Sequence, residues 1–280
     1  MIQSTLNCKG RLLDLSRPQV MGILNVTPDS FFDGGRYGDP SHALRQAEKM
    51  IRDGASILDV GGASSRPGAA EVPEEEETRR VLPVIEALSA EFPDTIVSVD
   101  TWRAGVALTA AEAGAGIIND ISAGNLDENL LTAVAKIQAP YVLMHMQGAP
   151  ATMQANPQYE DVVTDVLDFF LEKTAVLRTL GIRDIVLDPG FGFGKNLEHN
   201  YLLLNNLSTF SAVTGLPVLA GLSRKSMICK VLKVNPEHAL NGTTALHMVA
   251  LQQGARILRA HDVREAREVI QLWEAVDAAR

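Results

Sequence analysis

Cysteine is scarce in this chain, and negative charge exceeds positive charge. Only Cys8 and Cys229 are present, which is too few for a disulfide framework and gives no metal-ligand spacing. The chain has 25 lysine and arginine residues against 34 aspartate and glutamate residues, a formal net charge of −9. This balance argues against nucleic acid as a partner, because neutralising a phosphate backbone needs a basic face. Any anionic substrate must therefore be held by a local cluster of positive side chains.

Long apolar runs are also absent. No uninterrupted stretch approaches the roughly 18 residues that a membrane span requires, and the opening residues, MIQSTLNCKGR, contain no apolar leader segment. We therefore expect a cytoplasmic protein that does not bind membranes, and the small number of cysteines agrees with a reducing compartment.

Eight short apolar runs alternate with longer segments of helical spacing. The runs are rich in β-branched residues and short enough for buried strands. They lie at 20–26, 56–62, 95–100, 116–120, 140–146, 184–190, 217–223 and 256–262. Several of the intervening segments close with a glycine, as helices often do, at Gly54, Gly114, Gly181, Gly215 and Gly254. Eight strand-helix units are the number in a TIM barrel. We predict an α/β fold with a single (β/α)8 barrel domain over residues 1–280; a doubly wound open sheet is the alternative.

Four consecutive glutamates at 74–77 follow Pro73. Such a cluster can suggest a metal site, but proline at the first helical position with acidic residues in the first turn is typical of a helix start. We interpret the run as the solvated beginning of a helix.

A polar residue stands near the end of every predicted strand. Catalytic groups of a TIM barrel come from the carboxyl ends of its strands and the loops that follow, so these residues are candidates for a site. They are Asn25, Asp59, Asp100, Asn119, His145, Asp188, Ser223, Arg224, Lys225, Arg259 and His261. One Asp or Asn alone is more often a turn or helix cap, but here all eight strands share the pattern. The positive members follow the last two strands, where barrels often bind phosphate.

The segment DPGFGFGK at 188–195 resembles a nucleotide-binding loop in its three glycines and lysine. The dinucleotide fingerprint, however, requires glycine where Lys195 stands, and the phosphate loop requires glycine at Pro189 and a hydroxyl at Asn196. Both nucleotide interpretations fail. We interpret Lys195 as solvating the turn, and His145, which lies between two methionines, as a packed structural residue.

Eight motifs follow in order from residue 25 to residue 263: NVTPDSF, SRPGA, VSVDT, INDIS, LMHMQG, DPGFGFGK, GLSRKSMI and RAHDV. In this combination the chain resembles the bacterial dihydropteroate synthase family, pterin-binding barrels of folate synthesis, over essentially the whole barrel. The pattern SRK followed by R-x-H-D is not shared by the related pterin-dependent methyltransferases. Phe32, Ala63 and Ser65 depart from the usual family motifs.

The resemblance implies a transferase that condenses 6-hydroxymethyl-7,8-dihydropterin pyrophosphate with p-aminobenzoate, giving 7,8-dihydropteroate and pyrophosphate. The implied pterin site consists of Asp100, Asn119, Asp188, Lys225 and Arg259, and the Asp188 carboxylate accepts the guanidine-like edge of the ring. Asp100, Lys225 and Arg259 are the expected catalytic residues.

The same resemblance implies that Asn25, Arg259 and His261 bind the pyrophosphate. It also implies Mg²⁺ as the cofactor, held by diphosphate oxygens, waters and the Asn25 amide oxygen. The p-aminobenzoate site is implied to comprise Phe31, Asp33, Ser65, Arg66, Pro67, Phe193 and Ser226. Sulfonamides, which mimic p-aminobenzoate, are expected competitors.

The family is usually homodimeric, and the last two predicted helices offer a face for a second copy. Two alternatives to the synthase stay open. One is a pterin-binding paralogue that no longer catalyses, which the departures at Ala63 and Ser65 favour. The other is a pterin-dependent methyltransferase, against which the SRK and R-x-H motifs argue because a methyl donor has no pyrophosphate to bind.

Overall fold

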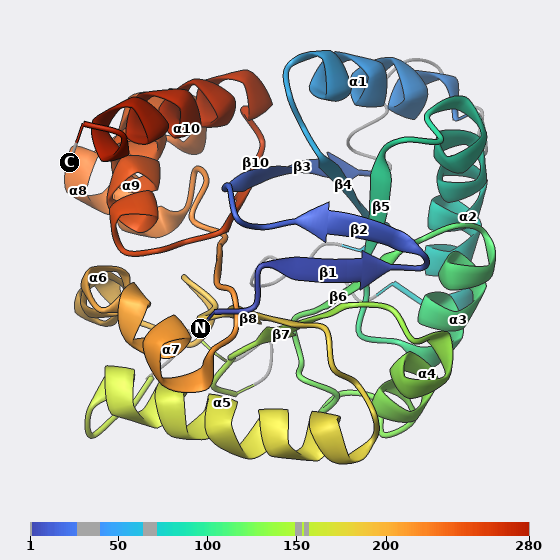
Figure 1. Ribbon diagram of the computed structural model, residues 1–280, viewed down its shortest axis with the longest axis horizontal. Helices are drawn as coiled ribbons and strands as arrows, with labels where there is room; N and C mark the ends of the chain where they lie inside the picture. The colour runs from blue at the N-terminus through green and yellow to red at the C-terminus, as the bar shows by residue number, and fades with distance from the viewer. Residues whose placement is uncertain (1, 27–39, 64–71, 149–152, 154–156, 280) are drawn as a thin grey trace.

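Eight parallel strands form the centre of the computed structural model, which describes residues 2–26, 40–63, 72–148, 153 and 157–279 (Figure 1). The strands are β3 (Gln19–Asn25), β4 (Ile57–Gly61), β5 (Ile96–Asp100), β6 (Ile117–Asp120), β7 (Tyr141–Met144), β8 (Ile185–Asp188), β9 (Leu219–Ala220) and β10 (Ile257–Ala260). Their order in the sheet is β8-β7-β6-β5-β4-β3-β10-β9. A parallel bridge between Leu187 and Val218 joins the two ends of the sheet. The predicted TIM barrel is confirmed, and the open-sheet alternative is wrong; that the chain is a single domain stays a prediction.

Helices surround the barrel (Figure 1). They are α1 (Ser41–Arg52), α2 (Glu74–Glu91), α3 (Ala104–Glu112), α4 (Leu130–Ile137), α5 (Val162–Thr179), α6 (Leu197–Asn205), α7 (Leu207–Thr214), α8 (Ser226–Leu232), α9 (Leu240–Gln252) and α10 (Val263–Asp277), with a 3-10 turn, η2 (Pro236–His238). All five glycines predicted to end helices have positive φ, from +72° at Gly215 to +121° at Gly114, a conformation that costs other residues more. In the described part of the chain, no helix is long and apolar enough to cross a membrane.

An antiparallel hairpin, β1 (Thr5–Cys8) and β2 (Arg11–Asp14), lies across the amino-terminal end of the barrel (Figure 1). The sequence did not predict it. One apolar cluster joins this hairpin to a side chain from each of the eight strands. Its members are Leu6, Cys8, Leu13, Leu15, Met21, Ile57, Ile96, Ile117, Val142, Val186, Leu219 and Ile257. Because apolar residues close the amino-terminal end, polar side chains are left to the opposite end.

The glutamate run at 74–77 does begin a helix, as predicted. Pro73 is the N-cap, one residue before the first helical position, and Glu74 begins α2. The run is not wholly solvated, however: Glu77 is fully buried, 3.7 Å from Arg103 Nε. Burial raises the pKa of Glu77 because the charged form loses its hydration.

Candidate active site

Four positions lie side by side at the carboxyl ends of neighbouring strands. The register pairs Asn25 with Gly61, Gly61 with Asp100, and Asp100 with Asn119. A Cβ built on Gly61 would lie 3.6 Å from Asn25 Oδ1 and 3.7 Å from Asp100 Oδ2. The Asn25 amide and the Asp100 carboxylate therefore flank the position that the missing side chain of Gly61 leaves open.

Arg259 connects Asp100 to the carboxylate of Asp59, which lies two residues before Gly61 in β4. Its Nε donates to Asp59 Oδ2 at 2.7 Å, and its Nη2 donates to Asp100 Oδ2 at 2.7 Å. Asn119 Nδ2 donates to the same Asp59 oxygen at 2.8 Å. Asp59 is fully buried, so these bonds to the carboxylate form in a low-dielectric environment, where they are strong. Asp59 therefore fixes both the guanidinium and the amide that the resemblance assigns to the pterin.

The charges in this cluster shift one another's protonation. Burial raises the pKa of Asp100 to about 7; Arg259 opposes the rise, and the like charge of Asp59 adds to it. Burial on its own would lower the pKa of Arg259, but Asp59 and Asp100 keep it above its ordinary value. A permanent cation thus lies beside a carboxyl group that titrates near neutral pH.

Asp188 is the last residue of β8 and is buried. Its Oδ1 accepts a hydrogen bond from the Gly190 N–H at 2.7 Å, and a Cβ on Gly221 would lie 3.5 Å from its Oδ2. Burial raises the pKa of Asp188, and the positive charge of Lys225 opposes that rise. The absence of a side chain at Gly221 leaves room beside the second carboxylate oxygen.

Lys225 lies between the glycine-rich turn and the start of α8. Its Nζ donates to the Phe191 carbonyl and lies 4.6 Å from the centroid of the Phe193 ring, within cation-π range. Burial lowers the pKa of Lys225 to about 8, and Asp188 counteracts part of that shift. Ser226 is the first residue of α8 and is exposed. The Lys225 side chain therefore lies against the Phe193 ring, and Ser226 is the next residue along the chain.

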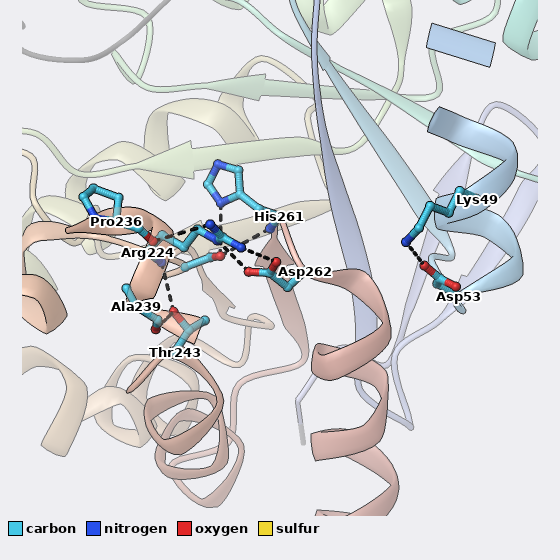
Figure 2. Close-up of polar contacts among 9 residues, drawn as sticks. Lys49, Asp53, Arg224, Pro236, Ala239, Thr243, His261 and Asp262 are labelled. Atoms are coloured by element: carbon cyan, nitrogen blue, oxygen red, sulfur yellow. Dashed lines mark hydrogen bonds and ion pairs between the residues drawn. The ribbon is translucent and has the colours of Figure 1, made fainter. Parts of the chain in front are cut away.

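Hydrogen bonds and an ion pair join the loops after β9 and β10 (Figure 2). Arg224 donates through Nε and Nη2 to the two carboxylate oxygens of Asp262, at 2.8 and 2.6 Å, and its N–H donates to Thr243 Oγ1 at 3.1 Å. On the same two loops, Ser223 Oγ lies 3.1 Å from His261 Nδ1. Arg224 therefore joins two loops, and its guanidinium charge is compensated by Asp262.

Two residues with minor roles in the sequence analysis are both buried, one as predicted and one not. His145 is buried, and its ring packs edge-on against Phe169, with centroids 4.8 Å apart, so its interpretation as a packed residue is confirmed. Lys195 is only 2% exposed, so the interpretation that it solvates the turn is wrong. The two side chains bond to each other, with Lys195 Nζ 3.0 Å from His145 Nδ1.

Part of the predicted p-aminobenzoate site falls on the two loops after β3 and β4. Phe32, one of the departures from the family motifs, falls there as well. The residues that lie outside the described part of the chain are Phe31, Phe32, Asp33, Ser65, Arg66 and Pro67.

Carboxylates, an amide and cations thus converge at the carboxyl end of a TIM barrel, which is the arrangement of a barrel enzyme. The model of the family described as "Pterin binding enzyme" matches residues 21–261. A dihydropteroate synthase of Escherichia coli is 49% identical over 274 residues, covering 97% of this chain and 96% of its own.

Solved structures agree with the sequence relatives. Yersinia pestis dihydropteroate synthase in a sulfonamide drug complex has a TM-score of 0.92 and 49% identity, covering 98% of this chain and 99% of its own. The enzyme from Xanthomonas albilineans in complex with 7,8-dihydropteroate has a TM-score of 0.88 and 42% identity, with coverage of 98% and 99%. The chain therefore belongs to the pterin-binding enzyme family and, within it, to the dihydropteroate synthases, which are transferases. These relatives do not support the methyltransferase alternative.

Proposed function

We propose that the residues at the carboxyl ends of the strands divide the dihydropteroate synthase reaction between a pterin half and a p-aminobenzoate half. In the reaction, the amine nitrogen of p-aminobenzoate attacks the pterin methylene carbon. The bond from that carbon to the pyrophosphate oxygen breaks, and the amine loses a proton. The single observation that carries the assignment is a hydrogen-bonded cluster drawn from four strands, in which Arg259 donates to Asp59 and Asp100 and Asn119 donates to Asp59.

The pterin half uses paired donors and acceptors. Asp188 accepts the guanidine-like edge of the ring, since a carboxylate can accept two parallel N–H bonds. Its oxygen beside Gly221 has room for one of these donors. Asn119 and Lys225 donate to the lactam side of the ring. Arg259 and Asp100 lie where charge develops as the pyrophosphate leaves, and groups fixed by their own hydrogen bonds stabilise such charge without reorganising.

Within the pterin half, the pyrophosphate is bound by Asn25, Arg259 and His261. Among the described residues no group of three or more His, Cys, Asp and Glu side chains could cage a metal ion. The side-chain oxygens of Asn25 and Asp100, on either side of Gly61, are nonetheless suitable ligands for Mg²⁺, which takes most of its ligands from substrate phosphates and water. Asn25 Oδ1 would hold the ion, and Mg²⁺ would neutralise the departing diphosphate.

The p-aminobenzoate half is built on Phe193 as a stacking wall, with Ser226 at the start of α8 receiving the carboxylate. The sulfonamide complex of the Yersinia pestis enzyme supports a site of this kind, and we expect sulfonamides to compete with p-aminobenzoate here. The remaining proposed contacts, on the loops after β3 and β4, lie outside the described residues.

We also propose that the chain forms a homodimer through the face carrying its last two helices. Leu272 and Val276 on α10 are apolar and exposed. In sedimentation experiments, Leu272→Glu should shift the protein toward the monomer, whereas Leu12→Glu, on the exposed edge of the hairpin, should not. A dimer that survives Leu272→Glu and Val276→Glu would place the interface elsewhere.

We place the enzyme in the cytoplasm. Both cysteines, Cys8 and Cys229, are free thiols in the structure. Free thiols are the normal state of cysteine in a reducing compartment.

Pyrophosphate release tests the whole assignment. The protein is incubated with dihydropterin pyrophosphate, p-aminobenzoate and Mg²⁺, and Arg259→Met should lower kcat by at least about 100-fold. Arg256→Met is the matched control, because Arg256 donates to the Ser16 carbonyl at the opposite end of the barrel. A folded wild-type protein that binds pterin but releases no pyrophosphate would instead be the non-catalytic paralogue.

A further inference from the structure

Lys195 is a buried lysine whose partners in the described part of the chain include no carboxylate. Its Nζ donates to the Phe193 carbonyl at 2.9 Å and to the His145 carbonyl at 3.2 Å, and lies 3.0 Å from His145 Nδ1. A lysine this deeply buried is unusual unless it is paired with an opposite charge. These three contacts must therefore stabilise the buried side chain without an opposite charge.

An uncharged amine fits the three contacts. It has two N–H donors for the two carbonyls and one lone pair that accepts the Nδ1–H of a neutral imidazole. Burial lowers the pKa of Lys195 well below its ordinary value, and the nearby Asp188 offsets only part of this. Burial also lowers the pKa of His145, and Lys195 lowers it further. Lys195 thus acts here through its three hydrogen bonds, and burial disfavours its charged form.

Other carbonyls of the glycine-rich turn are held by different groups. The Phe191 carbonyl accepts from Lys225 Nζ, and the Gly194 carbonyl accepts from the Tyr159 hydroxyl at 2.7 Å. Lys225 is also the lysine proposed to bind the pterin, and it cannot direct the same N–H to Phe191 and to the ring. Lys195 is buried, and its bond to the Phe193 carbonyl does not involve Lys225, so this bond does not require Lys225 to stay on the Phe191 carbonyl.

We propose that Lys195 is a positioning residue that fixes Phe193 for p-aminobenzoate, including when Lys225 leaves the Phe191 carbonyl to bind the pterin. This inference rests on the proposed role of Phe193 as the stacking wall. The anchor is rigid because the His145 backbone continues β7, and the His145 ring packs against α5 through Phe169. Lys195 therefore ties the wall of the second substrate site directly to the barrel.

Steady-state kinetics of Lys195→Met test the proposal, since methionine keeps the length of the stem and removes the N–H donors. We expect the KM for p-aminobenzoate to rise at least about tenfold, or roughly 1.4 kcal/mol. The value of kcat and the KM for dihydropterin pyrophosphate should stay within about threefold. Lys173→Met is the control, because Lys173 also donates to oxygens of a strand-helix loop, Asn125 Oδ1 at 2.6 Å and the Ala123 carbonyl at 3.3 Å. It should match the wild type.

Two results would overturn the proposal. A fall in kcat with an unchanged KM for p-aminobenzoate would mean that Lys195 supports only the fold. An equal rise in both KM values would mean that it supports the pterin pocket. Should Lys195→Met fail to fold, Lys195→Gln carries the same test, because its amide stands on a shorter stem and cannot reach both carbonyls.

Phe193→Ala separates the inference from the function on which it rests. If this variant leaves the KM for p-aminobenzoate unchanged, Phe193 is not the wall, and that part of the proposed function fails. If Phe193→Ala raises the KM while Lys195→Met leaves it unchanged, the wall stands and only the role of Lys195 is refuted.

Discussion

Replacing Asp59 with asparagine removes the deepest charge of the site while keeping the shape of the side chain. Asp59 accepts hydrogen bonds from Arg259 at 2.7 Å and from Asn119 at 2.8 Å, and it is fully buried. In Asp59→Asn the amide oxygen can still accept, but as a neutral group, so both bonds weaken or one is lost. Arg259 keeps its second partner, Asp100.

The magnitude follows from these two bonds. A hydrogen bond to a charged group is worth about 1.5–3 kcal/mol, roughly twice a neutral one. Weakening two of them should lower the free energy of unfolding by about 2–3 kcal/mol. This is less than the roughly 3–5 kcal/mol for breaking an isolated buried pair, because Asp100 continues to compensate Arg259.

The substitution should also change the pH dependence of stability. The folded-state pKa of Asp100, about 7, lies above the unfolded value of roughly 3.9, so the protonated form is favoured by folding. The contribution of Asp100 is therefore complete below about pH 4 and is lost as the pH rises through about 7. Because the charge of Asp59 raises the pKa of Asp100, Asp59→Asn should lower the upper end of this window.

Denaturant unfolding of the wild type and of Asp59→Asn between pH 5 and 8 measures both effects. Asp53→Asn is the matched control, since Asp53 pairs with Lys49 Nζ at 2.6 Å on the exposed face of α1 (Figure 2). A surface pair of this kind contributes at most about 0.5 kcal/mol. Equal losses in the two variants, or an unshifted pH profile in Asp59→Asn, would refute the reasoning.

The pterin edge, the pyrophosphate cluster and the order of binding give three more predictions. Asp188→Asn should weaken binding of a pterin analogue by about 2–5 kcal/mol in calorimetry, and an unchanged affinity would remove Asp188 from recognition. Asn25→Ala and His261→Ala should weaken pyrophosphate binding more than pterin binding; equal losses would mean that both only support the barrel rim. Saturating Mg²⁺ and pyrophosphate should tighten binding of p-aminobenzoate or a sulfonamide at least about tenfold, and equal affinity without them would indicate a preformed pocket.

Much of the architecture follows from short stretches of sequence and could be predicted from them. Each strand is a short β-branched run, and glycines such as Gly114 and Gly215 end helices because a left-handed residue is needed there. Counting the units therefore predicted the barrel, and its closure predicted that the strand ends would meet. The hairpin β1–β2 escaped because its two strands have four residues each and depend for burial on a core contributed by the whole barrel.

The hydrogen bonds inside the site join residues far apart in the sequence, so the pattern of neighbouring residues does not predict them. Asp59 and Arg259 are 200 residues apart and meet because β10 pairs with β3 and β3 pairs with β4. The lowered pKa of Lys195 likewise arises from burial, beside a histidine 50 residues away, His145. A sequence shows which side chains can ionise. Their charge depends on the solvent and neighbours that folding gives them, and for Lys195 and Asp100 those exist only once the barrel has closed.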